Sequence, residues 1–323
     1  MTREILNQNA IKETAPEYKY FEGVDIQWNK VPWIFDHQEL GKVSIDTYSI
    51  WNPAHHPEIA DRLAKGERCA LYMMGTFGVG EFFIPQEQAD HKILDEIKQR
   101  DRTQNLVVFA YPEDTRDFVD FERLPQALRF LKQSEKRLVI YPGPMHAIFP
   151  AKAGQMPTPD LVREEDQSAA FFWIPGHWGY ENLVAEMKKR VSKGLFGGGS
   201  LNIHGQEPSF TTADLRDREM VRHPEWLENI DFVILDEISE ASNIGRSHTQ
   251  VSFMREKPLV IRRGSLSPQK IALETGLELE VDEARKPASS KTPYDTLHNA
   301  EADRKVEFAL SRIARFKNRI SHI

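Results

Sequence analysis

The sequence comprises 323 residues, of which 40% are hydrophobic and 28% charged, a composition typical of a globular protein with a sizeable core. Its formal net charge of −7 disfavours broad, sequence-independent binding of nucleic acids. The single cysteine, Cys69, excludes an intrachain disulfide and a cysteine-based zinc site. No apolar run is long enough to span a bilayer, and the N-terminal segment lacks the apolar core of a secretory signal. We therefore expect a cytoplasmic protein without a membrane partner.

Strands and helices are predicted to alternate along most of the chain. Residues 1–45 show no clear periodicity and are interpreted as an extension around the main body. Hydrophobic periodicity and turn residues then predict helices over 55–66, 85–100, 124–133, 180–192 and 267–276, with Ser267 as the N-cap of the last. Short apolar or β-branched runs predict strands over 69–74, 105–111, 136–141, 167–174, 230–236 and 257–264. Such alternation predicts an α/β or α+β sheet with helices packed on it.

The C-terminal segment combines a polar linker with an amphipathic helix. Residues 283–303 are polar and rich in turn residues, which predicts a linker. The segment 304–320 places apolar residues at helical spacing between several lysines and arginines. A helix docked on the body with solvated charges is the favoured interpretation, and a basic helix that contacts RNA or a membrane is the alternative. We divide the chain into 1–45, 46–285 and 286–323.

Common phosphate-binding motifs are absent from the sequence. There is no P-loop, and the glycines of residues 75–80 lack the dinucleotide-binding spacing, which favours a tight turn there. Lys98, Arg100 and Arg102 stand at alternate positions before a predicted strand, so in an extended segment they would share one side. Such a side suits a polyphosphate, but on this stretch alone a solvated charge cluster at a helix end is the favoured interpretation.

A second polar segment follows three glycines at 197–199. Ser200 and Asn202 would share one side of a strand, and a hydroxyl and an amide can together bind phosphate oxygens. The glycines would allow a backbone and a ligand to approach closely. The histidines 146, 177 and 204 have no spacing that predicts a zinc site and are interpreted as hydrogen-bonded groups, so no metal-ligating residue is predicted.

The order of these segments resembles that of a known family. Gly-Val-Gly after a strand and turn is followed by Lys-x-Arg before a strand, Pro-Gly-Pro, a strand ending in x-Pro-x-His, Ser-x-Asn-x-x-Gly-x-x-Pro, a late strand containing Asp, and VIRRGSLS. Over about residues 46–285 this series resembles the YrdC/YciO-like family, whose best-known members are threonylcarbamoyl-AMP synthases. The resemblance implies a twisted mixed sheet with flanking helices and a concave, locally basic cavity.

The resemblance implies two groups of site residues. Nucleotide contacts would come from Lys98, Arg100, Arg102, Ser200, Asn202, Thr249 and Arg262, and the catalytic residues among them would be Lys98, Ser200 and Asn202. The substrate pocket would include Thr76, Trp173 and His177. The phosphate side of the family's site is largely retained.

The amino-acid side departs from the family pattern. The run from Tyr72 to Gly80 replaces the family's threonine-containing motif, and Trp173 replaces an arginine. Asp101 and Arg263 stand where the family has prolines, and His248 stands in the place of a serine.

The resemblance also implies a reaction. A carbamate formed from bicarbonate and an amino acid, threonine by family default, would attack the α-phosphorus of ATP and release pyrophosphate. Lys98, Arg100 and Arg262 would stabilise the developing negative charge together with substrate-bound Mg²⁺. The product would serve modification of a tRNA adenosine, with RNA or tRNA-modification proteins as partners. The alternative is a non-catalytic module that binds a nucleotide or double-stranded RNA, which the altered amino-acid side favours.

Overall fold

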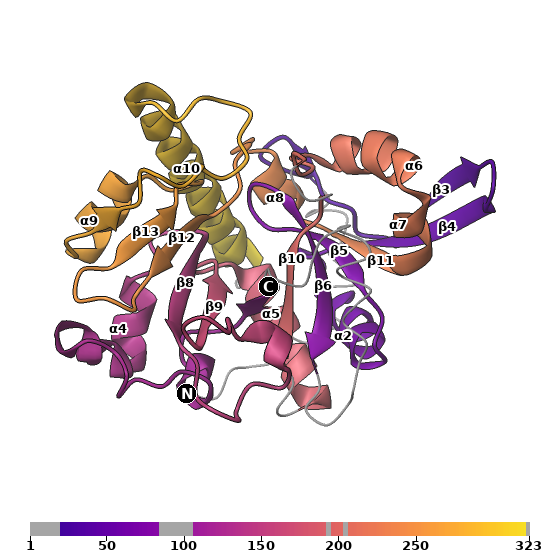
Figure 1. Ribbon diagram of the computed structural model, residues 1–323. Coiled ribbons are helices and arrows are strands. Elements are labelled where there is room, and N and C mark those ends of the chain that lie inside the picture. Colours follow the sequence, from indigo (N-terminus) through magenta and orange to yellow (C-terminus); the bar gives the residue numbers. More distant parts are fainter. Residues whose placement is uncertain (1–19, 84–105, 192–194, 203–205, 321–323) are drawn as a thin grey trace.

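A mixed twelve-stranded sheet forms the body of the protein (Figure 1). The computed structural model describes residues 20–83, 106–191, 195–202 and 206–320. The strand order is β14-β13-β12-β8-β9-β7-β10-β6-β5-β11-β4-β3. The strands are β3 (Val31–His37), β4 (Gly41–Ser49), β5 (Cys69–Tyr72), β6 (Phe77–Phe83), β7 (Val107–Phe109), β8 (Met145–Pro150), β9 (Ser168–Trp173), β10 (Leu195–Ser200), β11 (Phe232–Leu235), β12 (Thr249–Ser252), β13 (Leu259–Arg262) and β14 (Glu280–Val281); β1 (Tyr20–Phe21) and β2 (Val24–Asp25) pair separately.

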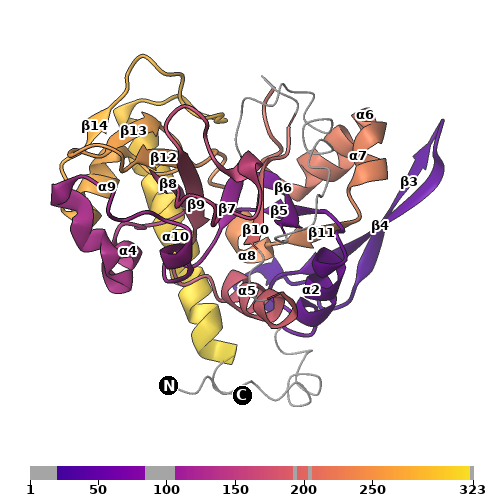
Figure 2. The ribbon, with the colours of Figure 1, turned by 60° about the horizontal axis from the view of Figure 1, so that its bottom comes forward.

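Helices cover the sheet and its ends. The α-helices are α2 (His56–Ala64), α4 (Ser134–Val139), α5 (Trp178–Arg190), α6 (Met220–Arg222), α7 (Pro224–Asn229), α8 (Glu237–Glu240), α9 (Pro268–Thr275) and α10 (Thr296–Ile320). Shorter turns are the 3₁₀ segments η1 (Asp114–Asp117), η2 (Gln126–Lys132) and η3 (Pro159–Leu161) and the π-helical η4 (Asp214–Glu219). Figure 2 shows α2 and α5 side by side, with α10 crossing the strands beside them. None of the helices in the described ranges is long and apolar enough to cross a membrane.

The predicted fold class is confirmed, and most predicted elements are present. Strand β11 runs parallel to both β4 and β5, and its four residues are buried, which explains its uninterrupted apolar sequence. Ser267 caps α9 as predicted, because its side chain accepts a hydrogen bond from the Lys270 amide. The predicted boundary between residues 45 and 46 falls inside β4, whose partner β3 projects from the body (Figure 1). The predicted helix at 85–100 lies outside the described residues.

One predicted strand is wrong. Residues 136–141 belong mainly to α4, although their apolar run suggested a strand. The buried guanidinium of Arg137 donates hydrogen bonds to the carbonyl oxygens of Pro112 and Leu131, at 2.7 and 2.9 Å. These bonds hold the segment against the preceding turn, while Leu138 and Val139 remain exposed. A tertiary contact of one polar side chain therefore overrides the local preference for a strand.

The C-terminal helix is docked on the body, as the favoured interpretation predicted. Val306, Ile313 and Phe316 are buried, and Phe316 packs edge-on against Trp51. The helix begins at Thr296, inside the predicted linker, where the Asp295 side chain accepts a hydrogen bond from a backbone amide of the first turn.

Four basic side chains of this helix are engaged in ion pairs. Arg312 and Arg315 both bind Glu22, Lys317 pairs with Glu181, and Lys305 pairs with Glu301 one turn away. The pairs with Glu22 and Glu181 connect α10 to the N-terminal segment and to α5. They also neutralise positive charges that an RNA-binding helix would present.

A buried polar cluster connects three elements next to this helix. The Asp236 carboxylate accepts hydrogen bonds from Trp51 Nε1 and His177 Nε2, both at 2.9 Å, at the end of β11. The adjacent Glu237 accepts hydrogen bonds from the Gln27 amide and the Ser49 hydroxyl. Burial raises the pKa of the Glu237 carboxyl to about 7, so the folded state favours its neutral form.

We predict that Glu237→Gln weakens the pH dependence of stability. When folding raises the pKa of an acid, the free energy of unfolding falls as the pH rises from the pKa of the unfolded state, 4.5, to that of the folded state, about 7. This shift corresponds to roughly 2.5 kcal/mol lost between pH 5 and pH 8, and glutamine removes it. Urea unfolding at both pH values measures the difference. Glu39→Gln, at an exposed position, is the control, and an unchanged difference in Glu237→Gln would show that this carboxyl does not titrate in that range.

Candidate functional site

A cavity of about 320 Å³ lies on one face of the curved sheet. Alternate residues of neighbouring strands share a face, and the cavity is lined by such residues from five strands. They are Val107 and Phe109 on β7, His146 and Ile148 on β8, Ala170 on β9, Gln250 on β12 and Arg262 on β13. Met73, Thr76, Arg163, Glu165, Gly199, Ser200, Ser247, His248 and Arg285 complete the described lining.

A contact between distant segments closes one side of this cavity. The turn at 73–76 joins β5 to β6 and lies against residues 244–248, which precede β12. His248 Nε2 donates a hydrogen bond to the Met73 carbonyl. A Cβ at Gly75 would lie 2.5 Å from the Arg246 carbonyl oxygen, so this position requires glycine. The adjacent Met74 has a φ of 51°, a strained conformation for a side chain of this size.

Three arginines and one glutamate make the cavity locally basic. Arg163 lies 3.8 Å from Glu165, and Arg285 pairs with Asp282 at 3.3 Å. Arg262 has no carboxylate within ion-pairing distance among the residues that the structure describes. Its Nε is buried without a hydrogen-bond partner there, and only a long bond of 3.4 Å joins its guanidinium to the His248 carbonyl. Burial lowers the pKa of Arg262 to about 10, so it remains a cation at neutral pH.

Two histidines beside Arg262 are held neutral. Burial lowers the pKa of His248 to about 3, and burial together with the charge of Arg262 lowers the pKa of His146 well below its usual value. The Gln250 amide donates to His146 Nδ1 at 3.0 Å, which places the His146 proton on Nε2. Since His248 Nε2 donates to Met73, its Nδ1 is an acceptor. These imidazoles can therefore supply hydrogen bonds but no positive charge.

The glycine-rich strand β10 forms another wall. A Cβ at Gly198 would lie 1.9 Å from the Val79 carbonyl oxygen, so β6 and β10 can pair here only with glycine. Gly199 and Ser200 line the cavity, and Ser200 is half-buried. Asn202 lies past the end of β10, where its amide donates to the Gln206 carbonyl at 2.9 Å, and is not among the lining residues. The structure thus places Ser200 at the cavity and Asn202 in the turn that follows.

Two predicted threonines occupy different positions. Thr76 lines the cavity, and its hydroxyl lies 3.2 Å from the Ser209 carbonyl oxygen. Thr249 is fully buried behind the lining, where its hydroxyl donates to the Leu266 carbonyl and accepts from the Leu266 amide. Both bonds hold the loop after β13 against β12, and Gly264 in that loop has no room for a Cβ. Thr249 therefore supports the segment that carries Arg262.

Two residues predicted for the substrate pocket lie elsewhere. Trp173 is on the face of β9 opposite Ala170 and packs on Tyr111, with ring centroids 4.1 Å apart. His177 is fully buried at the start of α5, stacked on Trp51 and hydrogen-bonded to Asp236. Neither lines the cavity. Strand alternation explains the first placement, because only every second residue of β9 faces the cavity.

The remaining predicted phosphate contacts, Lys98, Arg100 and Arg102, lie outside the described residues, and their roles stay predictions. Conversely, sequence reasoning missed His146, Gln250, Arg163 and Arg285 as cavity residues. The alternation of His146 and Ile148 in one strand could have indicated a shared face, but no motif marks Arg163 or Arg285. Within the described ranges, no group of three or more His, Cys, Asp and Glu side chains could hold a metal ion.

The fold is similar to that of P. abyssi Sua5. A structure of a double variant of P. abyssi Sua5 matches with a TM-score of 0.55 and 19% sequence identity, over 74% of this chain and 65% of that chain. A structure of P. abyssi Sua5 complexed with L-threonine matches with a TM-score of 0.54 and 20% identity, over 72% and 60% of the two chains. The similarity thus spans less than two thirds of the Sua5 chain.

No protein-family model matches the sequence, and no curated protein matches it significantly. The predicted resemblance is confirmed at the level of the fold.

We predict that Gly198→Ala destabilises the protein by more than about 3 kcal/mol, because the new methyl group would collide with the β6 backbone. The control is Gly276→Ala at the C-cap of α9, where φ is +68° but no atom lies within 4 Å. This control should cost about 1 kcal/mol, from backbone strain alone. Urea unfolding measures both costs, and equal costs would contradict the tight pairing of β6 with β10.

Proposed function

We propose that the cavity binds ATP and that the protein forms a carbamoyl-adenylate from ATP, bicarbonate and an amine, with release of pyrophosphate. The observation that carries this proposal is Arg262, a cavity-lining cation with no carboxylate partner among the described residues. A buried guanidinium without an anionic partner is stabilised by a bound phosphate. The Sua5-like fold and the family resemblance support the choice of ATP over other phosphate ligands.

The reaction requires stabilisation of negative charge rather than a covalent intermediate. As the carbamate oxygen attacks the α-phosphorus, charge accumulates on the phosphoryl oxygens and on the departing pyrophosphate. Arg262 would stabilise that charge from β13, and the Ser200 hydroxyl would donate to an α-phosphate oxygen from β10. Lys98 and Arg100 would act on the same charge, with Mg²⁺ bound to the ATP phosphates supplying further charge neutralisation.

The amine would bind beside neutral hydrogen-bonding groups. His146 carries a proton on Nε2 and His248 offers an acceptor at Nδ1, so together they can orient a polar group without competing for the phosphates. Threonine is the first amine to test, because a P. abyssi Sua5 structure is described in complex with L-threonine. The replacement of the family's threonine motif by the turn at 73–76 makes a different amine the next candidate.

The alternative, a non-catalytic module for nucleotide or double-stranded RNA, receives less support. Its basic helix has most of its described cations in ion pairs with acidic groups of the same chain, so it offers little free positive charge for a duplex. Retention of Ser200 and Arg262 at one cavity is better explained by catalysis.

Pyrophosphate release tests the proposal. With ATP, Mg²⁺ and bicarbonate, we expect release to depend on one amine in a panel of amino acids that includes threonine. Arg262→Ala should lower the rate about 100-fold, as expected for loss of one group that stabilises transition-state charge. Arg255→Ala, in the exposed turn between β12 and β13, is the matched control and should leave the rate unchanged.

The outcomes separate the two functions. Saturable ATP binding without pyrophosphate release from any amine would replace the enzyme by the non-catalytic module. An Arg262→Ala rate equal to that of Arg255→Ala would remove Arg262 from the mechanism. Neither result could be attributed to misfolding if the melting temperatures of the two variants agree.

A further inference from the structure

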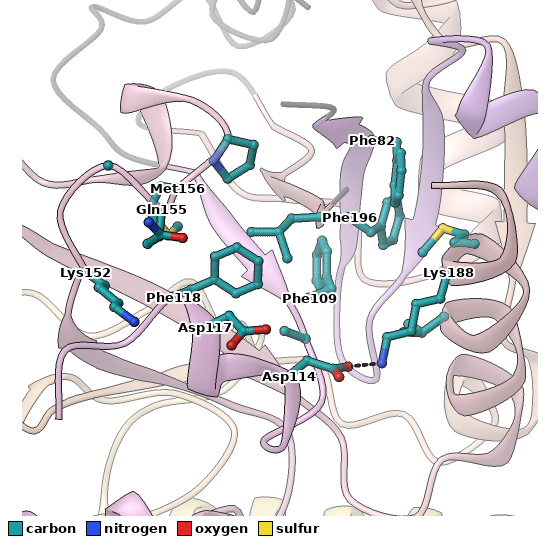
Figure 3. A pocket seen from close by; sticks show the side chains of 16 residues that line it. Phe82, Phe109, Asp114, Asp117, Phe118, Lys152, Gln155, Met156, Lys188 and Phe196 are labelled. Carbon is teal, nitrogen blue, oxygen red and sulfur yellow. Dashed lines mark ion pairs between the residues drawn. The ribbon is translucent and has the colours of Figure 1, made fainter. Parts of the chain in front are cut away.

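A second cavity, of about 600 Å³ and shown in Figure 3, lies at the other end of β10 from the first. Phe109 on β7 lines both cavities. The first cavity takes Ser200 from the end of β10, whereas the second takes Leu195 and Phe196 from its start. The volume is in the range of small-molecule sites.

Apolar and aromatic side chains make up most of this lining. They are Phe82, Phe109, Ala110, Phe118, Met156, Pro157, Val184, Met187, Leu195 and Phe196. Phe109 and Phe196 lie with ring centroids 5.1 Å apart, and two methionines provide adaptable surfaces around them. The rings offer a flat or bulky apolar group a surface on which to stack, beside the polar groups that complete the lining.

The charged groups at this cavity balance one another. Asp114 forms an ion pair with Lys188, drawn as a dashed line in Figure 3. Asp117 and Lys152 are exposed, and neither has an oppositely charged group within ion-pairing distance in the described part of the chain. Figure 3 shows Lys152 and Lys188 on opposite sides, with phenylalanine rings between them. The cavity therefore offers one carboxylate and one ammonium that a ligand can use.

We propose that this cavity is a second ligand site, which binds a small zwitterion with an aromatic or large apolar body. The apolar body would lie on Phe109 and Phe196. Its ammonium group would pair with Asp117 and its carboxylate with Lys152. A ligand of single charge would leave one of these two groups without a partner, and a small polar ligand would leave the rings exposed to water. The site is separate from the reaction proposed above and does not depend on it.

Isothermal titration calorimetry with L-phenylalanine as the probe tests this site. L-phenylalanine should bind saturably. Three analogues should each bind at least about fivefold more weakly. They are phenethylamine, which lacks the carboxylate, 3-phenylpropionate, which lacks the ammonium group, and L-serine, which lacks the apolar body.

Charge variants identify the contacts. Lys152→Ala should weaken L-phenylalanine about fivefold and remove its advantage over phenethylamine, whereas Asp117→Asn should remove its advantage over 3-phenylpropionate. Both side chains are exposed, so these variants should melt like the parent protein. Lys136→Ala, at an exposed position on α4, and Arg262→Ala, in the first cavity, should leave binding unchanged.

Three results would overturn the proposal. They are no saturable binding of L-phenylalanine at millimolar concentration, equal affinity for the probe and its singly charged analogues, and loss of binding in Arg262→Ala but not in Lys152→Ala. The last result would place the probe in the first cavity. Failure of pyrophosphate release would leave this test unaffected, because calorimetry does not require turnover.

Discussion

The candidate site depends on the contact between the turn at 73–76 and the segment before β12. Five strand-to-strand steps separate β12 from β6 in the sheet, which in a flat sheet would correspond to about 24 Å. Yet His248, next to β12, donates a hydrogen bond to Met73 in the turn that leads into β6, and the Arg246 backbone touches Gly75. The sheet must therefore curl on itself, and the cavity is the space enclosed by that curl. Arg262 and Ser200, on strands well separated in the sheet, line one cavity for the same reason.

This curvature requires backbone segments to approach one another closely, and at a few positions only glycine allows that approach. Gly75 allows the turn to touch Arg246, Gly198 allows β10 to pair with β6, and Gly264 allows the loop after β13 to cross the residues next to His248. Each Cβ would meet backbone atoms, which cannot move aside as a flexible side chain can. The strain at Met74 lies in the same turn, where the surrounding contacts maintain an unfavourable φ. The glycines before Ser200 and the single Gly264 after Arg262 thus serve the shape of the sheet.

The sequence predicted the helices and strands better than it predicted which side chains lie together. Helical periodicity located α5 and α9, and short apolar runs located β9 and β11, whose residues are all buried. It failed at α4, where the hydrogen bonds of Arg137 to distant carbonyls decide the conformation. Motif order pointed to Ser200 and Arg262, which meet at the cavity. It also selected His177, which serves instead as a buried partner of Asp236, because a motif does not specify which face of an element a side chain occupies. Arg163 and Arg285 come from irregular segments, which have no period from which a face could be predicted.

The two cavities differ because the two ends of β10 meet different surroundings. At one end, the described lining carries three arginines, Arg163, Arg262 and Arg285, and one carboxylate, Glu165, so the first cavity favours an anion. At the other end, two carboxylates balance two ammonium groups beside the phenylalanine rings. Net charge therefore gives no preference for a ligand, and selectivity depends on the ligand's shape and on the separation of its charges. Phe109 contributes to both, since β7 is short enough for one ring to lie at the boundary. A single curved face can therefore hold two sites of different selectivity, because its curvature supplies the concavity while each end supplies its own chemistry.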